Sequence, residues 1–332
     1  MNKSSIIEVA KLAGVSPSTV SRVTNGTAIV KEETKKKVLE AMAKLGYQPN
    51  SAAQSLSSKR SNTLGMVVAQ LDGPFYGPMI SGVESALRAH GKHLIIASGS
   101  GDAKSEEEAV SFLLNRQVDG FILLTEWLEK RYVEELSQSI PVYMINQHYE
   151  GLEDRIMLLD DVDGSYQATK YLIEHGHKKI ACISAQEFKQ DANDRVQGYK
   201  KALREAGLPV LDDLIVRTSF EVQGGIDGMQ ELKNRNADFT AIVVGNDESA
   251  IGVYSWANAN GLSIPDDLSV IGYDDILLAN FINPPLTTMR APNYEMAKTA
   301  ADNAFKEIYR KSPPQGASFQ TRLIERSSVA DL

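Results

Sequence analysis

The first 46 residues place apolar side chains at helical spacing between glycines. Ser5 and Glu8 have the spacing of a capping box, which predicts that a helix starts there. Gly14 predicts where this helix ends. The apolar positions expected on its inner face are Ile6, Val9, Ala10 and Ala13.

Two further helices are predicted after Gly14. Ser16 is a capping residue, Pro17 suits a first helical position, and Val20 and Val23 lie three apart on the inner side. Two short helices joined at Gly14 form a helix-turn-helix. The third helix runs through Val38, Leu39, Met42 and Leu45 to a stop at Gly46.

From residue 64 onward, short apolar runs alternate with helical stretches. The runs are LGMVVA, HLIIAS, DGFILL, PVYMIN, KIACIS, TAIVVG and LSVIGY. This alternation predicts an α/β fold of parallel sheets covered by helices on both faces. The length favours two lobes, with a boundary near Leu159–Val162 and later crossings at 286–293 and 321–328. A ligand is then expected between the lobes, at the carboxyl ends of the strands.

The composition is that of an ordinary globular protein. Of 332 residues, 42% are hydrophobic and 23% are charged. No apolar run approaches the ~18 residues of a membrane span, and MNKSSIIEVAKLAG predicts no signal peptide. Cys182 is expected to be a small buried hydrophobic residue. We therefore expect a cytoplasmic protein.

The charge is distributed unevenly. Residues 1–60 hold ten Lys and Arg against four Glu, a net charge of +6, whereas the whole chain carries −8. Residues 61–332 therefore carry −14. A basic head on an acidic body favours a head that binds a polyanion, although a solvated basic face would have the same composition.

In a helix-turn-helix, the second helix lies in the major groove of DNA with its N-terminal residues near the base edges. The polar side chains at that position are Ser18, Thr19, Ser21 and Arg22. Arg22 can bridge guanine O6 and N7, whereas serine and threonine contact bases or phosphates. The basic head is therefore predicted to bind double-stranded DNA.

The stretches IIEVAKLAGVSPSTVSRVTNG and GYQPNSAAQSL resemble the head of the lac/galactose repressor family of bacterial transcription factors. By this resemblance, the residues expected at the DNA are Ser16, Pro17, Ser18, Thr19, Ser21, Arg22, Asn25, Thr34, Tyr47, Asn50, Ala53 and Leu56. Two positions depart from the family. Lys31 replaces the usual Ser or Asp before the third helix, which loses a capping oxygen. Gln54 replaces the usual hinge arginine, which removes a charge that would contact the DNA backbone.

The resemblance also accounts for Leu56, which lies in a segment too short to form a stable helix alone. In the family, two such hinge segments fold together in the minor groove of the operator, and a leucine wedges between base pairs. The implied division is a head at 1–48, a hinge at 49–61 and an effector-binding and dimerisation core at 62–332. The N-lobe of this core would comprise about 62–160 and 292–321, and the C-lobe about 161–290 and 322–332.

Polar and aromatic residues stand where the core strands are predicted to end. Taken singly, each is explained by a cap or by core packing at least as well as by a ligand. The resemblance assigns to the effector Arg195, Asn246, Asp274, Phe220 and, in the loop after the first strand, Asp72, Phe75 and Tyr76. Such groups supply the donors and acceptors that sugar hydroxyls require, and an aromatic face that stacks on a pyranose.

The nature of the effector is predicted from the branch of the family. DGPFYGPMISGVE, INQHYEGLEDRIMLLDD and DANDRVQGYKKAL resemble the galactose-repressor branch. The purine-repressor branch has an arginine and a threonine where this chain has Lys189 and Asp191. An acidic side chain suits hydroxyl groups better than a purine carbonyl. We therefore predict a sugar or a small glycoside, and a homodimer on a pseudo-palindromic operator.

Several other signals carry little weight. His90, His93, His175 and His177 lack neighbouring cysteines or an HExxH pattern, so we expect solvated helix ends and no metal site. The acidic run 106–108 is expected to be the exposed start of a helix. Neither a P-loop nor GxGxxG occurs, and no cofactor is expected.

Two alternatives belong to other classes of protein. A periplasmic-type sugar-binding protein would share the two-lobed core but would need a signal peptide and no DNA-binding head. A sugar-modifying enzyme would need a paired acid and base, for which Asp274 and Asp275 are the candidates. Adjacent residues on an extended strand point to opposite sides, so no catalytic residue is predicted.

Overall fold

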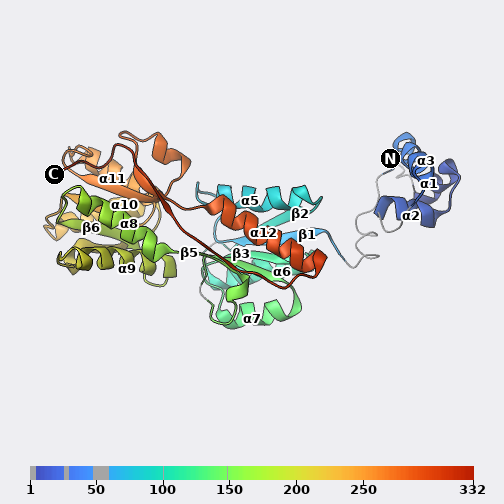
Figure 1. The fold of residues 1–332 in the computed structure, drawn as a ribbon, viewed down its shortest axis with the longest axis horizontal. Coiled ribbons are helices and arrows are strands. Elements are labelled where there is room, and N and C mark those ends of the chain that lie inside the picture. Colours follow the sequence, from blue (N-terminus) through green and yellow to red (C-terminus); the bar gives the residue numbers. More distant parts are fainter. Residues whose placement is uncertain (1–4, 26–29, 48–59, 100, 148) are drawn as a thin grey trace. The chain divides into compact units, whose positions relative to one another are not determined.

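The structure is a computed structural model that describes residues 5–25, 30–47, 60–99, 101–147 and 149–332 (Figure 1). The chain divides into two compact units. The first is Met1–Thr63 with Arg116–Asp119, and the second is Leu64–Asn115 with Gly120–Leu332. Along the described residues, no helix is long and apolar enough to cross a membrane.

The head consists of three helices. They are α1 (Ile6–Ala13), α2 (Pro17–Asn25) and α3 (Glu32–Leu45). The predicted capping box is confirmed, because Ser5 N donates to Glu8 Oε2 at 2.7 Å and Glu8 N donates to Ser5 Oγ at 3.3 Å. Gly14 ends α1 with a φ of +66°, a left-handed conformation that glycine adopts without strain.

The second and third helices start differently. Thr19 N donates to Ser16 Oγ at 3.2 Å, as the sequence predicts for a capped start of α2. Within the described part of the chain, the Lys31 side chain makes no capping hydrogen bond to α3. The predicted loss of a capping oxygen is therefore confirmed, and such a loss typically costs about 0.5–2 kcal/mol.

The apolar faces of the head helices meet in one small core. Its buried members are Val9, Ala10, Val20, Val38 and Ala41. Leu39, one of the apolar residues of the predicted third helix, lies outside this core and is 50% exposed. Its neighbour Val38 already faces inward, and successive helical residues are turned by about 100°.

The second unit contains two six-stranded sheets. In spatial order, the strands of the first sheet are β11 (Ala317–Phe319), β5 (Ile156–Leu159), β4 (Val142–Ile145), β3 (Phe121–Leu124), β1 (Thr63–Val68) and β2 (His93–Ser98). Those of the second are β12 (Arg322–Ile324), β10 (Thr287–Arg290), β9 (Ser269–Asp274), β8 (Ala241–Val244), β6 (Ile180–Ala185) and β7 (Ile215–Thr218). The pairings of β9 with β8 and β10 are parallel, whereas β12 runs antiparallel to β10. The predicted α/β fold with parallel sheets is confirmed.

Helices cover both sheets (Figure 1). Those of the first sheet are α5 (Tyr76–Ala89), α6 (Ala103–Asn115), α7 (Lys130–Ser139) and α12 (Asn293–Arg310), and those of the second are α8 (Asp161–Glu174), α9 (Gln190–Glu205), α10 (Val222–Asn234) and α11 (Asp247–Ala259). Short 3-10 turns occur at Glu153–Arg155, Asp212–Leu214 and Leu277–Asn280. α5 packs against α12 so closely that a Cβ on Gly82 would lie 2.4 Å from Tyr294 O.

The chain passes between the two sheets three times. It does so between β5 and α8, between β10 and α12, and between β11 and β12. In the first sheet β1 lies between β3 and β2, and in the second β6 lies between β8 and β7. Connections therefore leave β1 and β6 in opposite directions, which opens a crevice at their carboxyl ends.

Candidate functional site

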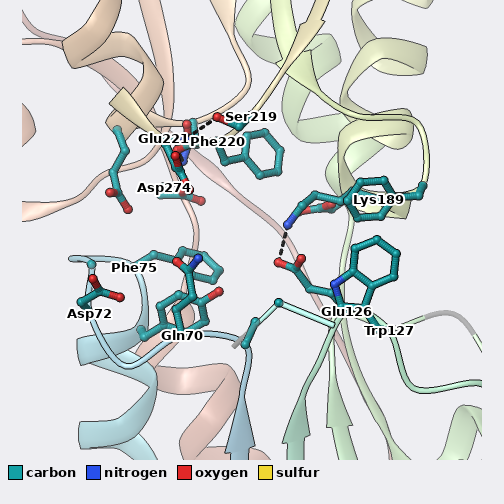
Figure 2. A pocket seen from close by; sticks show the side chains of 18 of the residues that line it. Gln70, Asp72, Phe75, Glu126, Trp127, Lys189, Ser219, Phe220, Glu221 and Asp274 are labelled. Carbon is teal, nitrogen blue, oxygen red and sulfur yellow. Dashed lines mark hydrogen bonds and ion pairs between the residues drawn. The ribbon is translucent and has the colours of Figure 1, made fainter. Parts of the chain in front are cut away.

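A cavity of about 490 Å³ lies between the two sheets, at the carboxyl ends of their strands (Figure 2). Its walls include Ala69 and Gln70 after β1 and Glu126 after β3, which belong to the first sheet. From the second sheet, Lys189 follows β6 and Asn246 follows β8. Small-molecule pockets of proteins span about 300–1,000 Å³, so the cavity has the size of a ligand site.

The structure brings together all seven residues that the sequence assigns to the effector. Each of them lines this cavity: Asp72, Phe75, Tyr76, Arg195, Phe220, Asn246 and Asp274. Phe75 and Tyr76 meet edge to face with ring centroids 5.2 Å apart. That these seven residues contact an effector stays a prediction.

Arg195 is held at the base of the cavity and is only 4% exposed. Its Nε donates to Asp161 Oδ1 at 2.9 Å, and Nη1 donates to the carbonyl of Gly245 at 2.6 Å. The guanidinium also lies 3.9 Å from the ring centroid of Tyr273. These contacts fix the direction of the fork, which leaves Nη2 turned toward Asp274 at 4.0 Å.

Asp274 ends β9 in an unusual backbone conformation. Its φ of +103° is strained for a residue with a side chain, and such strain typically costs about 1–3 kcal/mol. Its Oδ1 is buried and receives no hydrogen bond within the described part of the chain. Burial raises the pKa of Asp274 well above its usual range, and the charge of Arg195 opposes that rise. Asp274 thus lines the cavity with an acceptor that has an ion-pair contact to Arg195 but no hydrogen bond among the described residues.

The neighbouring Asp275 has a different environment. Its carboxylate accepts from Arg290 Nε at 2.6 Å and from Arg326 Nη2 at 2.5 Å. Asp274 lines the cavity, whereas Asp275 is held by these two arginines. The two carboxylates therefore have separate partners, as predicted, but the backbone is not extended at this point, since the φ angles of Asp274 and Asp275 are +103° and +59°.

Asn246 has a structural role besides lining the cavity. Its Oδ1 accepts from Ser249 N at 3.0 Å and so caps α11. Its Nδ2 donates to the carbonyl of Phe220 at 2.8 Å, which fixes the position of that aromatic residue. The sequence left open whether Asn246 caps a helix or contacts a ligand, and the structure shows that it caps α11.

Two contacts join the lobes along one side of the cavity. Trp127 stacks on Phe188 with ring centroids 4.4 Å apart, and Lys189 Nζ pairs with Glu126 (Figure 2). Trp127 and Glu126 follow β3 of the first sheet, whereas Phe188 and Lys189 follow β6 of the second. We call these four residues the interlobe clasp. No pattern in the sequence singles out Trp127.

The clasp is anchored by Glu106, which corrects one prediction. The run 106–108 was expected to be exposed, but Glu106 is 0% exposed. Its carboxylate accepts from the backbone N–H groups of Glu126, Trp127 and Leu128 at 2.8, 2.9 and 2.9 Å. The signal was present in the sequence, because Glu106 shares the helical spacing of Ala109, Val110 and Leu113, the buried face of α6.

His177 corrects another prediction. It was expected at a solvated helix end but is 2% exposed, with Nδ1 2.8 Å from Thr240 Oγ1 and Nε2 3.2 Å from the carbonyl of Ala330. Burial lowers the pKa of this histidine. It joins the C-terminal segment to the second sheet. Across the described residues, no group of His, Cys, Asp and Glu side chains is arranged to hold a metal ion.

The residues predicted at the DNA lie on the head. On α2 and its cap, Ser16, Pro17, Ser18 and Arg22 are exposed, while Thr19 and Ser21 are half-buried. Thr34 and Tyr47 are also half-buried, and Asn25 is the last residue of α2. The predicted contacts Asn50, Ala53 and Leu56, together with Gln54, lie outside the described residues. α2 thus displays a polar surface next to its N-terminus.

Comparison with known families gives one match for the head and another for the two-lobed core. Residues 5–50 match the family described as "Bacterial regulatory proteins, lacI family". Residues 61–327 match "Periplasmic binding proteins and sugar binding domain of LacI family".

Curated relatives match along most of their length. The ribose operon repressor of Haemophilus influenzae is 36% identical over 322 residues, which cover 97% of this chain and 96% of the relative. The HTH-type transcriptional regulator DegA of Bacillus subtilis is 38% identical and covers 89% and 88%. The HTH-type transcriptional regulator GalR of Escherichia coli is 34% identical and covers 98% and 95%.

Solved structures share the fold. The transcriptional regulator CelR in complex with cellobiose has a TM-score of 0.75 at 30% identity, covering 98% of this chain and 100% of that one. A LacI-family regulator from Enterococcus faecium with bound ribose has a TM-score of 0.73 at 29% identity, covering 81% and 99%. The Lac repressor dimer bound to operator and an anti-inducer has a TM-score of 0.88 at 24% identity, covering 99% and 100%, a likeness of fold alone.

Proposed function

Because the chain belongs to the LacI family of bacterial regulatory proteins, we propose that it is a sequence-specific transcriptional repressor whose operator affinity is controlled by a saccharide. The observation that carries this proposal is the presence, in one chain, of a helix-turn-helix head and a two-lobed core with a polar cavity. A periplasmic sugar-binding protein would not need a DNA-binding helix-turn-helix head. The curated relatives described above are all named as regulators of transcription.

In this proposal α2 is the recognition helix. Arg22 contacts guanine, and the hydroxyls of Ser18, Thr19 and Ser21 contact bases or phosphates. Ser16, Pro17, Asn25, Thr34, Tyr47 and Asn50 complete the contacts to the backbone and groove. Ala53 and Leu56 lie in the hinge, where Leu56 wedges into the minor groove.

The effector binds in the interlobe cavity. Arg195 and Asn246 supply donors, Asp274 supplies an acceptor that receives no hydrogen bond within the described part of the chain, and Phe220 stacks on the ring. Asp72, Phe75 and Tyr76 close the cavity from the first lobe. The solved relatives with bound cellobiose and ribose support a saccharide as the ligand class.

The proposed assembly is a homodimer on a pseudo-palindromic operator. The division is that expected from the sequence: a head at 1–48, a hinge at 49–61, and a core whose N-lobe is 62–160 and 292–321. Exposed Leu277, Leu278 and Phe281 on one turn of the C-lobe support a contact between copies. Twofold symmetry of the protein then matches twofold symmetry of the DNA.

We assign no catalytic residue and no cofactor. The one carboxylate pair considered as acid and base has separate partners, since Asp275 is held by Arg290 and Arg326. A regulator that acts on chromosomal DNA works in the cytoplasm at the nucleoid. Effector binding would shift the lobes and alter the support of the hinge, a coupling of typically ~1–3 kcal/mol.

Fluorescence anisotropy tests the proposal with a labelled DNA fragment from upstream of the gene, at fixed salt, with and without saccharides. Arg22→Gln is expected to weaken specific binding by about 1–3 kcal/mol, because it removes a bidentate contact to guanine. Asp274→Asn is expected to abolish the response to saccharide while retaining DNA binding. Asparagine keeps the shape of the side chain and tolerates a positive φ.

The two variants serve as controls for each other, because each is expected to alter one function and spare the other. Leu56→Ala should likewise weaken operator binding and leave saccharide affinity unchanged. An effector that strengthens DNA binding would keep the switch and reverse its sign. Wild-type operator affinity in Arg22→Gln would contradict the assignment of the recognition helix.

A further inference from the structure

We infer that the effector is a saccharide that carries no phosphate, sulfate or carboxylate group. This inference rests on the proposed function and concerns the same cavity. It is drawn from the charges of the cavity walls, the partners of its cations and the helix ends that face it.

The cavity is rich in carboxylates. Among its lining residues that the structure describes, six are acidic and two are basic. The acidic residues are Asp72, Glu126, Asp191, Glu221, Glu248 and Asp274, and the basic ones are Lys189 and Arg195. The low-dielectric walls of a cavity concentrate the electric field of its charged residues. Because acidic residues outnumber basic ones here, this field repels an anionic ligand.

Both cations are already engaged. Arg195 donates to Asp161 and to the carbonyl of Gly245, and Lys189 pairs with Glu126 across the cavity. A phosphate group normally takes up charge-assisted bonds from Arg or Lys. Here a phosphate would have to displace Glu126 from Lys189, and at Arg195 Nη2 it would meet the carboxylates of Asp191 and Asp274 at 3.8 and 4.0 Å.

In the C-lobe, the N-termini of the helices that border the cavity, which are the other common phosphate site, carry acidic residues. α9 has Asp191 in its first turn, Glu221 stands at the N-cap position of α10, and α11 has Asp247 and Glu248 in its first turn. These carboxylates interact with the positive helix ends that would otherwise attract an anion.

A further repulsion arises where the lobes approach each other at Gly73. A Cβ on Gly73 would lie only 3.5 Å from Glu248 Oε1, so the loop after β1 approaches α11 closely. Burial raises the pKa of Glu248, and the charges of Asp72 and Glu221 raise it further. An added phosphate would increase this repulsion, whereas hydroxyl groups would donate hydrogen bonds to the carboxylates.

The acceptor at Asp274 that lacks a hydrogen bond indicates the same ligand chemistry. Its Oδ1 is buried and without a hydrogen bond in the described part of the chain, and it faces a cavity with aromatic walls at Phe75 and Phe220. An uncharged polyol ring supplies hydroxyl donors on its edge and an apolar face for stacking. A phosphate group without a proton supplies no donor.

Isothermal titration calorimetry on the full chain tests the inference with matched pairs of ligands. The pairs are galactose and galactose 6-phosphate, glucose and glucose 6-phosphate, and ribose and ribose 5-phosphate, with cellobiose as an additional uncharged probe. For the uncharged sugar that binds, the phosphate ester should bind at least about 100-fold more weakly, since placing like charges together costs several kcal/mol. An ester that binds as tightly as its parent sugar overturns the inference and leaves the proposed function intact. Binding of no member of the panel, charged or uncharged, counts against the saccharide effector itself.

A double variant tests whether the charge of the cavity causes this discrimination. In Glu221→Gln with Glu248→Gln, the ratio of the two dissociation constants should fall at least about fivefold, and more at low salt. The matched control is Glu108→Gln with Glu129→Gln, which removes two exposed carboxylates outside the cavity and should leave the ratio unchanged. An equal ratio in both double variants would overturn the electrostatic basis of the inference.

Discussion

Replacing Arg195 with methionine is expected to lower the free energy of unfolding of the core by about 3–5 kcal/mol and to abolish the response to effector. The guanidinium pairs with Asp161 at 2.9 Å and lies 3.8 Å from Asp191 and 4.0 Å from Asp274. Removing it leaves Asp161 and Asp274 buried without a counter-ion. Urea denaturation of the full chain, followed by far-UV circular dichroism, measures the loss.

Two further variants separate this charge effect from a simple loss of hydrogen bonds. Arg217→Met removes a half-buried arginine whose hydrogen bonds, among the described residues, go to the carbonyls of Ala185 and Ala192, and should cost about 0.5–1.5 kcal/mol. Adding Asp161→Asn to Arg195→Met should restore part of the lost stability, because one buried charge is removed. An equal loss in the two arginine variants would contradict the account of Arg195 as a counter-ion.

The second large effect is expected from Asp247→Asn, which should remove a pH dependence of stability. Asp247 is fully buried; its Oδ1 accepts from Thr288 Oγ1 at 2.6 Å and its Oδ2 accepts from Ile276 N at 2.9 Å. Burial raises the pKa of Asp247 from 3.8 to about 7, although these two hydrogen bonds lower it. An asparagine amide can retain both contacts, since its oxygen accepts and its nitrogen donates to the hydroxyl of Thr288.

The direction of the effect follows from the raised pKa. In the unfolded chain Asp247 loses its proton near pH 4, whereas in the folded chain it retains the proton up to about pH 7. Its contribution to stability is therefore full below pH 4 and is lost as the pH rises to about 7, a decrease of up to about 4 kcal/mol. At pH 8 the Asp247→Asn variant should be the more stable protein, and at pH 4 the two should be similar.

Denaturation midpoints measured from pH 4 to pH 8 test this prediction. Asp267→Asn is a suitable control, because Asp267 is exposed and its carboxylate accepts from Ser263 N in a loop. The control should retain the fall in stability between pH 4 and pH 7. A wild-type protein whose stability rises steadily over this range would contradict the assignment of Asp247.

Local features of the chain were predictable because their causes are local. The capping box at Ser5, the left-handed stop at Gly14 and the alternation of strands and helices depend on residues a few positions apart. The seven cavity residues were found by resemblance to a family, since spacing alone does not separate a cap from a ligand contact. Asn246 illustrates the point, because it both caps α11 and lines the cavity.

The features that were missed depend on contacts between distant segments. Trp127 and Phe188 are 61 positions apart and meet only because β3 and β6 end at the same cavity. His177 is buried because the C-terminal segment, at Ala330, folds back over it. The burial of Glu106 was predictable locally, because Glu106 lies on the apolar face of α6. Its hydrogen-bond partners at 126–128 were not, because they lie after β3, about 20 residues along the chain.

The interlobe clasp also gives the protein an intrinsic optical probe. The chain contains two tryptophans, and Trp256 lies on α11 in the C-lobe. Trp127, in contrast, has its indole stacked on a phenylalanine of the opposite lobe. A relative movement of the lobes changes the solvent exposure and ring contact of Trp127. In a chain with Trp256→Phe, its emission spectrum therefore follows the opening and closing of the core without an attached label.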